Sequence, residues 1–246
     1  MKLNKGDMVL AGIDLAWGEK NPSAIAQGCL SNGVLRVIAI DKLVVGIDAV
    51  FEKLRPDLRG IAIDAPLIIE NQKGQRACEK ETGVAYGSKG ASCHTSNASL
   101  FPNAQSVRFS KRLRKNEFYH LDGSKWQIEC YPHPAIIEIF GLQQRLKYKK
   151  GSAGEKKEGQ KELASYIRKL KTSVRLKFVV QDSFSEVLAE EYIAGLKGRD
   201  LKANEDALDS LICLYIAGLY AADPYKGRTF GDKNNGYIWI PFGSCI

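Results

Sequence analysis

Two stretches of sequence decide the fold of this chain: MVLAGIDLA at residues 8–16 and GIAIDAP at residues 60–66. Each is an apolar run with one aspartate near its carboxyl end, Asp14 in the first and Asp64 in the second. Apolar runs of this length are typical of strands that are buried on both faces, and Pro66 prevents the second strand from continuing. We therefore expect two central strands that carry aspartates at equivalent places.

The sequence between these two strands predicts an antiparallel meander. Residues 24–30 and 34–40 are strand-like apolar runs, joined by an Asn-Gly pair at residues 32–33. Asn-Gly between apolar runs is the strongest short-range signal of a β-hairpin. Apolar residues then recur at helical spacing over residues 47–54. The predicted order is three antiparallel strands, one short helix and a further strand, which indicates an α/β protein.

The rest of the chain predicts one domain with an insertion. Periodicity fades at about residues 67–125, where glycine, serine and asparagine are dense, and such composition favours a long functional loop or lid. Regular patterns then predict a strand at 126–131, helices at 134–140, 156–171, 183–194 and 205–220, and a terminal loop and strand at 231–242. No internal repeat or low-complexity linker divides the sequence, so we expect residues 1–246 to form a single domain with a loop-rich insertion.

The composition excludes several classes of protein. The chain has 246 residues, of which 44% are apolar and 26% charged, which is enough for a large buried core. No apolar run approaches the roughly 18 residues of a membrane span, and the start lacks the pattern of a secretory signal. The six cysteines are scattered without a CxxC pair. We therefore expect a cytoplasmic protein without disulfides and without membrane contact.

The positive charge is concentrated in one segment. The formal net charge is +8, and residues 145–177 hold twelve Lys and Arg against three Glu, a local balance of +9. A second basic cluster at residues 108–119 is interleaved with aromatic residues. Cations mixed with stacking faces suit a nucleic acid, DNA or RNA, as the partner. The alternative for a charge run is an ordinary solvated helix face.

Four aspartates are expected to converge. Asp206 and Asp209 lie three residues apart on the predicted helix 205–220, so their carboxylates point in similar directions. Asp14 and Asp64 end strands, and sites in open α/β sheets form beyond the carboxyl ends of the strands. Each aspartate alone is also typical of a strand end or an exposed helix turn. Clustered carboxylates without histidine or thiolate partners are hard ligands, so the set predicts an Mg²⁺ or Mn²⁺ site.

Six motifs in one order carry a resemblance to a known family. They are GIDLAW at 12–17, IAIDAPL at 61–67, RACE at 76–79, IECYPHPA at 128–135, YKKGSAGEKKEGQ at 148–160 and EDALDSLICLYIA at 205–217. Together they resemble the domain-of-unknown-function 429 family of predicted nucleases with an RNase H-like fold. The resemblance implies an α/β, RNase H-like domain with a mixed central sheet, an antiparallel meander and flanking helices.

The same resemblance implies a divalent-metal-dependent nuclease, with acids placed as in RuvC-type junction resolvases. The implied catalytic acids are Asp14, Asp64, Glu129, Asp206 and Asp209, and all of these except Glu129 would be metal ligands. In a two-metal mechanism one ion activates the attacking water and the other stabilises the leaving oxygen. The expected function is therefore hydrolysis of phosphodiester bonds in nucleic acid.

Five basic residues are expected to bind the substrate. Lys149, Lys150, Lys156 and Lys157 would hold phosphates, and Arg76 would neutralise charge on the reacting phosphate. Contacts of this kind would not read the base sequence.

Two other functions remain open from the sequence. An ATP-dependent phosphotransferase of the actin and sugar-kinase fold also uses strand-end aspartates. Such enzymes normally need two RNase H-like units, and 246 residues without a repeat supply one. A non-catalytic nucleic-acid-binding protein of RNase H-like fold would keep the basic clusters, but binding alone does not require the acid cluster.

The roles of Cys78, Cys93, His94 and His133 stay open as well. The spacing of these residues matches no standard zinc site. His133 is either a general base or the cap of the helix that follows, and the cap is the favoured interpretation. Residues 83–90 lack the glycine and lysine order of a phosphate-binding P-loop.

Overall fold

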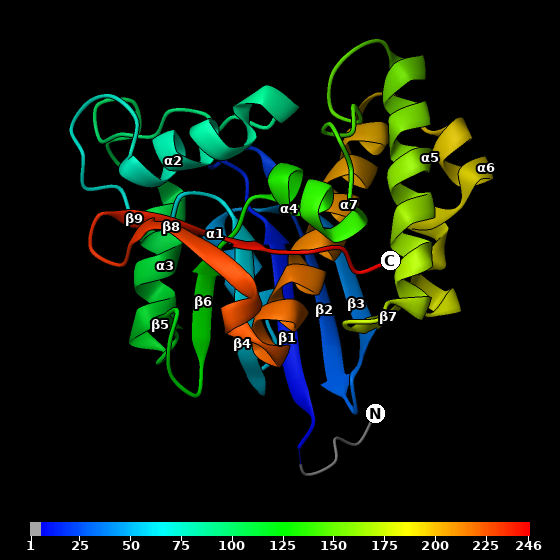
Figure 1. Cartoon of the computed structure of the whole chain (residues 1–246), viewed down its shortest axis with the longest axis horizontal. Coiled ribbons are helices and arrows are strands. Elements are labelled where there is room, and N and C mark those ends of the chain that lie inside the picture. The colour runs from blue at the N-terminus through cyan, green and yellow to red at the C-terminus, as the bar shows by residue number, and fades with distance from the viewer. Residues whose placement is uncertain (1–5) are drawn as a thin grey trace.

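The chain forms an α/β structure around a mixed sheet (Figure 1). The computed structural model describes residues 6–246. Within them, seven strands form one sheet in the order β5-β6-β4-β1-β2-β3-β7, and β8 and β9 pair separately. The strands are β1 (Met8–Asp14), β2 (Pro22–Ser31), β3 (Val34–Val45), β4 (Leu58–Asp64), β5 (Tyr119–His120), β6 (Trp126–Glu129), β7 (Lys177–Val179), β8 (Gly227–Asp232) and β9 (Gly236–Pro241).

The register of the sheet places the two strand-end aspartates side by side. β1 pairs antiparallel with β2, and β2 with β3, which confirms the predicted meander. The turn between β2 and β3 has φ of 48° at Asn32 and 71° at Gly33, and positive φ at both residues is what a type I′ hairpin turn requires. β1 pairs in parallel with β4, with Asp14 opposite Asp64. Both carboxylates therefore leave the same edge of the sheet.

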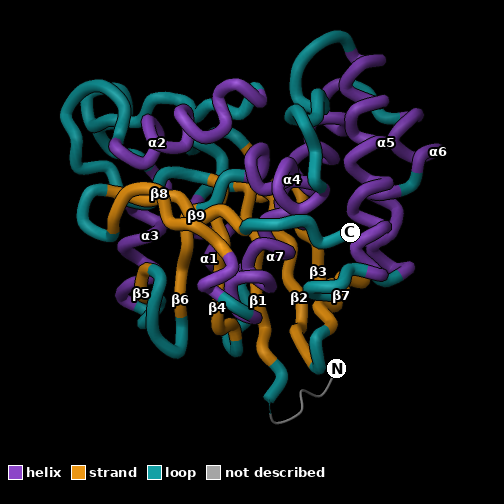
Figure 2. Tube along the Cα trace, in the orientation of Figure 1, coloured by secondary structure: helices purple, strands orange, loops and turns teal. Residues whose placement is uncertain are grey.

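Helices cover both faces of the sheet (Figure 2). They are α1 (Ile47–Lys53), α2 (Ala77–Tyr86), α3 (Gln105–Lys115), α4 (Pro132–Phe140), α5 (Ala153–Lys169), α6 (Glu190–Gly195) and α7 (Gly198–Ala222). In Figure 1, α7 crosses in front of the strands, where it contacts β1, β2 and β4. The opposite face packs against apolar side chains of α1 and α3, among them Val50 and Phe109. Within the described residues, no helix has the length and apolar character needed to cross a bilayer.

Side chains of β1 alternate between the two faces of the sheet. Val9, Ala11 and Ile13 pack in the cluster with α1 and α3, whereas Leu10 packs in the cluster with α7. This alternation, which is general for strands, puts Asp14 on the face that α7 covers. Asp64 lies on the same face, because the parallel register matches it with Asp14.

A glycine lets α7 approach β1 very closely. A Cβ atom placed on Gly12 would lie 1.9 Å from the backbone nitrogen of Leu214 and 2.3 Å from the carbonyl oxygen of Ser210. No side chain fits in this space, so the backbones of strand and helix are in direct contact. This contact sets the height of α7 above the carboxyl end of β1, two residues before Asp14.

The region predicted as a long loop holds regular structure. Between residues 67 and 125 lie α2, α3, strand β5 and a short 3-10 helix at Gly87–Lys89, and α3 covers a face of the main sheet. The sequence had predicted a loop-rich insertion here and had not predicted these helices. The predicted helix 183–194 is also divided, into a 3-10 segment at Asp182–Leu188 and α6. The terminal loop and strand are a hairpin of β8 and β9.

We predict that Gly12→Ala destabilises the protein by at least about 3 kcal/mol, because the added methyl group must push α7 off β1. Chemical denaturation of both proteins measures this loss. The matched control is Gly83→Ala inside α2, where nothing lies within 4 Å of the new Cβ. That change should stabilise the protein by up to about 1 kcal/mol through helix propensity. Equal stability of the Gly12→Ala variant and the parent would show that the contact does not fix α7.

Candidate metal centre

Three carboxylates meet at the carboxyl ends of β1 and β4. Oxygen atoms of Asp14, Asp64 and Asp209 all lie within 4.8 Å of one another. Asp14 and Asp64 are partly exposed, whereas Asp209, on the overlying α7, is fully buried. The parallel register brings Asp14 and Asp64 together, and the close approach of α7 at Gly12 places Asp209 beside them.

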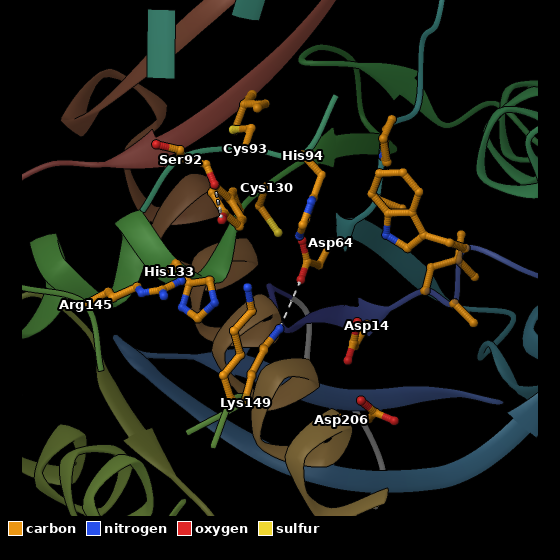
Figure 3. A pocket seen from close by; sticks show the side chains of 18 of the residues that line it. Asp14, Asp64, Ser92, Cys93, His94, Cys130, His133, Arg145, Lys149 and Asp206 are labelled. Carbon is orange, nitrogen blue, oxygen red and sulfur yellow. Dashed lines mark hydrogen bonds and ion pairs between the residues drawn. The ribbon is translucent and has the colours of Figure 1, made fainter. Parts of the chain in front are cut away.

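One lysine and one tyrosine reach the cluster from the segment before α5. The Lys149 Nζ lies 2.7 Å from the Asp209 Oδ2 and 4.0 Å from the Asp64 Oδ2. The Tyr148 hydroxyl donates a hydrogen bond of 2.7 Å to the Asp209 Oδ1. Figure 3 shows Lys149 beside Asp64, with the ion pair drawn as a dashed line. Lys149 was predicted to bind a phosphate, and in the structure its ammonium group forms ion pairs with Asp209 and Asp64.

When all three carboxylates are ionised, the cluster carries more negative charge than Lys149 offsets. Burial raises the pKa of Asp14 well above its usual value, and Asp209 raises it further. Burial also raises the pKa of Asp64 to about 7, although Lys149 acts against this shift. Burial lowers the pKa of Lys149, but Asp209 and other neighbours outweigh this and hold it well above its usual value. Three ionised carboxylates against one ammonium would leave a net charge of −2.

The donor set fits a hard divalent cation. All three side chains offer carboxylate oxygens, the ligands that Mg²⁺ and Mn²⁺ prefer. The buried Asp209 Oδ2 has an ion pair with Lys149 but accepts no hydrogen bond in the described structure. A cation that binds this oxygen would share it with Lys149 or displace the ammonium, and Asp14, Asp64 and Asp209 are the residues that could hold a metal.

Asp206 lies outside this cluster, contrary to the expectation that four acids converge. The Asp206 Oδ1 lies 2.6 Å from the Lys202 Nζ, which also contacts Glu205 at 2.7 Å. The physical reason is the helix itself, since three residues along α7 separate Asp206 from Asp209 by about 4.5 Å of axial rise. Asp206 still lines the cavity beside the cluster, where its charge is balanced by Lys202.

Arg76 and Glu129 form a second, separate ion cluster. The Arg76 guanidinium lies 2.6 Å from the Glu129 Oε1 and 2.9 Å from the Glu79 Oε1, and all three side chains are almost fully buried. It also donates to the Ile68 carbonyl oxygen, and the Leu67 N–H donates to Glu129. Both residues also line the cavity that holds Asp14 and Asp64, so the predicted roles of Arg76 on a phosphate and of Glu129 as a catalytic acid stay predictions, made by side chains that already have charged partners. Through these hydrogen bonds and ion pairs, the two side chains connect β6, α2 and the loop after β4.

A cavity of about 1080 Å³ opens over the three acids. Besides Asp14 and Asp64, its lining includes the cations Arg145, Lys147, Lys149, Lys150 and Lys202, and the side chains of Trp17, Cys93, His94, Tyr131 and His133. Figure 3 labels Cys93, His94, His133, Arg145 and Lys149 around the cavity. Lys150 thus lies where the sequence placed it, at the candidate site. Lys156 and Lys157 do not line the cavity, and the Lys157 Nζ donates to the Ala194 carbonyl oxygen.

Cys93 and His133 are poorly suited to catalysis by thiolate or imidazolium. Burial raises the pKa of Cys93 to about 12, so the thiol stays protonated at neutral pH. Burial lowers the pKa of His133 to about 3, so its ring stays neutral. The favoured interpretation of His133 as a helix cap was wrong, because Tyr131 is the N-cap residue of α4 and no side-chain cap bond forms.

Several side chains at the candidate site did not stand out in the sequence. Tyr148 holds Asp209, and Arg145 and Lys147 line the cavity, yet they stood out only as members of a basic segment. Trp17 was noticed as part of a motif and given no role. Its place three residues after Asp14 was the available signal, because the residues that follow a strand-end acid border the same site.

Comparison with known proteins gives a family-level result. A family model described as "Protein of unknown function (DUF429)" matches residues 12–233 of the chain. No curated protein and no solved structure matches the chain. The matched range contains every residue of the acid cluster and of the cavity wall except Ile238. It agrees with the resemblance found from the six sequence motifs.

Without divalent ions, Asp64 should make the protein less stable as the pH rises. Its pKa of about 7 in the folded state exceeds the ordinary value of 3.8, so the folded state binds the extra proton and stability is lost between about pH 4 and pH 7. Asp64→Asn cannot titrate. Its stability relative to the parent should therefore grow by at least about 1 kcal/mol from pH 4.5 to pH 8, measured by urea unfolding in EDTA.

The control for this pH effect is Asp57→Asn. A hydrogen bond from Arg55 lowers the pKa of Asp57 below 3.8, so Asp57 is ionised in both the folded and the unfolded state over this range, and the stability of this variant relative to the parent should stay nearly constant from pH 4.5 to pH 8. A pH-independent difference between Asp64→Asn and the parent would contradict the raised pKa of Asp64.

Mn²⁺ should raise the melting temperature if the three acids bind it. Binding to the folded state alone adds about 2.7 kcal/mol at 100 times the Kd, or roughly 5–10 °C for a domain of this size. Asp14→Asn and Asp209→Asn should lose most of the shift, whereas Asp206→Asn should keep most of it because Lys202 already balances Asp206. Thermal melts with and without Mn²⁺ measure this, and the same shift in all three variants would remove the cluster as the binding site.

Proposed function

The chain belongs to the DUF429 family, and from that starting point we propose that it is a divalent-metal-dependent hydrolase that cleaves phosphodiester bonds in nucleic acid. The observation that carries the proposal is one cavity in which an acid cluster and a set of cations face the same space. The acids suit a metal ion, and the cations suit the phosphates of a polyanion. The six cysteines are free, which suits the cytoplasmic location that we also propose.

The order of elements supports an RNase H-like fold as part of the proposal. An antiparallel meander of β1, β2 and β3 is followed by α1 and by a parallel strand, β4, whose last residue is an aspartate. A late helix, α7, returns over the sheet and brings the third acid. This is the general plan of RNase H-like domains that the sequence motifs resemble.

Asp14, Asp64 and Asp209 would hold Mg²⁺ or Mn²⁺. When bound, such an ion supplies an activated water and stabilises the negative charge that develops on the oxygens of a phosphodiester. Tyr148 fixes the orientation of Asp209 through the hydrogen bond to the Oδ1. Lys149 keeps part of the acid charge neutral, so that an anionic substrate can approach the cluster.

Three other cations are free to bind phosphate groups. Arg145, Lys147 and Lys150 line the cavity, and within the described residues none of their side chains forms an ion pair or donates a hydrogen bond. Lys147 and Lys150 are exposed. These side chains would position the backbone of a nucleic acid without reading its sequence, since phosphates carry no base information. Hydrolysis would then break one P–O bond, with water supplying a hydroxyl group to phosphorus and a proton to the leaving oxygen.

We predict cleavage of DNA or RNA in Mn²⁺ by the parent protein and at least about 100-fold slower cleavage by Asp14→Asn and Asp64→Asn. Each change removes ligand charge at nearly constant side-chain volume, and loss of a metal contact costs several kcal/mol of barrier. Gel assays with labelled single-stranded and duplex substrates measure the rates. The control Asp182→Asn, at an exposed position away from the cavity, should cleave like the parent. No Mn²⁺-dependent cleavage by the parent would overturn the proposed function.

A further inference from the structure

Trp17 is an exposed indole at the wall of the cavity. It lies in the loop after β1, three residues beyond Asp14, and 42% of its surface is accessible. The other two tryptophans, Trp126 and Trp239, are 6% and 1% exposed and belong to the core. A large aromatic ring gains stability from burial, so its exposure beside an acid cluster is not explained by packing.

The structure holds this indole in a fixed position. The ring of Phe101 meets it edge-on, with 4.8 Å between the ring centroids and an interplanar angle of 62°. The ring of His94 meets it at 6.4 Å and 82°. Perpendicular contacts of this kind are the favourable geometry for aromatic pairs. Trp17 is therefore not a freely rotating side chain. With His94 it forms an aromatic wall of the cavity, and Phe101, which does not line the cavity, supports the indole.

The backbone before Trp17 is held as well. The Ala16 N–H donates to the Ser23 hydroxyl at 3.0 Å, and the Ala16 carbonyl accepts a hydrogen bond from the Gln105 side chain on α3. Strand β2 and helix α3 thus fix the backbone of Ala16, the residue that precedes Trp17. A ring fixed in advance loses little conformational entropy when a ligand binds.

The cavity therefore combines three kinds of surface: the acid cluster, cations and an aromatic wall. Three residues of chain span at most about 11 Å, so Trp17 lies within that distance of Asp14, measured between Cα atoms. A ligand that uses all three surfaces carries phosphate groups and a flat ring close together. A nucleotide has this chemistry, and stacking of bases on tryptophan is tolerant of sequence.

We propose that Trp17 is a stacking platform for an unpaired base of the substrate, so that the cavity takes single-stranded nucleic acid in preference to duplex. The inference rests on the proposed function, because it assumes that the phosphates bind beside the acids. In a duplex both faces of each base are covered by neighbouring bases, and exposing one costs a few kcal/mol. An unpaired base can stack on the indole without this cost.

The test measures binding separately from cleavage. In the Asp64→Asn background, fluorescence anisotropy follows a labelled single-stranded oligonucleotide, its duplex, and a chain of the same length in which every base is missing. Trp17→Ala should weaken binding of the single strand by about 5-fold to 150-fold and leave the abasic chain unchanged. Trp17→Phe, which keeps an aromatic face, should lose less. The control Tyr225→Ala removes an aromatic ring that is 94% exposed and lies outside the cavity, and should bind like the background protein.

The outcomes distinguish failure of the stacking platform from failure of the proposed hydrolysis. Loss of affinity that depends on the bases and on Trp17 supports the platform, even if the parent cleaves nothing in Mn²⁺, in which case only hydrolysis fails. Equal binding by Trp17→Ala and its background, equal losses for the normal and abasic strands, or tighter binding of duplex would overturn the platform while cleavage by the parent stands. No binding of any oligonucleotide would overturn both. Thermal melts of the Trp17 variants check that the fold is intact.

Discussion

The direct backbone contact between α7 and β1 at Gly12 is the constraint on which the candidate site depends. It fixes how far the helix sits above the sheet, and so where Asp209 lies relative to Asp14. A helix packed through ordinary side chains would lie several Å higher, since helix axes and sheets normally keep about 10 Å between them. At that distance the third carboxylate could not reach the pair formed by β1 and β4.

The structure contains two groups of acids that differ in how their negative charges are balanced. Glu79 and Glu129 share Arg76 and accept backbone N–H groups. Burial raises the pKa of Glu129, but Arg76 and the Leu67 N–H favour its charged form, and these contacts hold the elements around α2 together. Asp14 and Asp64 share one lysine with Asp209 and have raised pKa values from burial. The first arrangement stabilises the fold. In the second arrangement the carboxylates repel one another, which is common at sites that bind a cation or carry out catalysis.

The elements that the sequence predicted well are those with clear apolar patterns. β1, β4, the meander and the helix after it follow from apolar runs and an Asn-Gly turn. Helices α2 and α3 were missed, and their buried faces are largely polar. The buried positions recur at helical spacing in both, but α2 buries Glu79 and Thr82, and α3 buries Ser106 and Ser110. In α2 the buried polar residues leave little periodic apolar signal. In α3 the buried pair Phe109 and Leu113, four residues apart, was such a signal, but the segment was interpreted only as a basic cluster with aromatic residues.

The sequence by itself placed Asp14 and Asp64 at the carboxyl ends of two central strands, because each residue ends an apolar run. It also located the basic segment that contains Lys149 and Lys150. Only the tertiary structure decided that Asp209 joins the pair while Asp206 turns to Lys202, and that Arg76 and Glu129 neutralise each other. The reason is physical. Strand spacing and register are local and regular, whereas the pairing of charges depends on distances of a few Å between segments far apart in the chain.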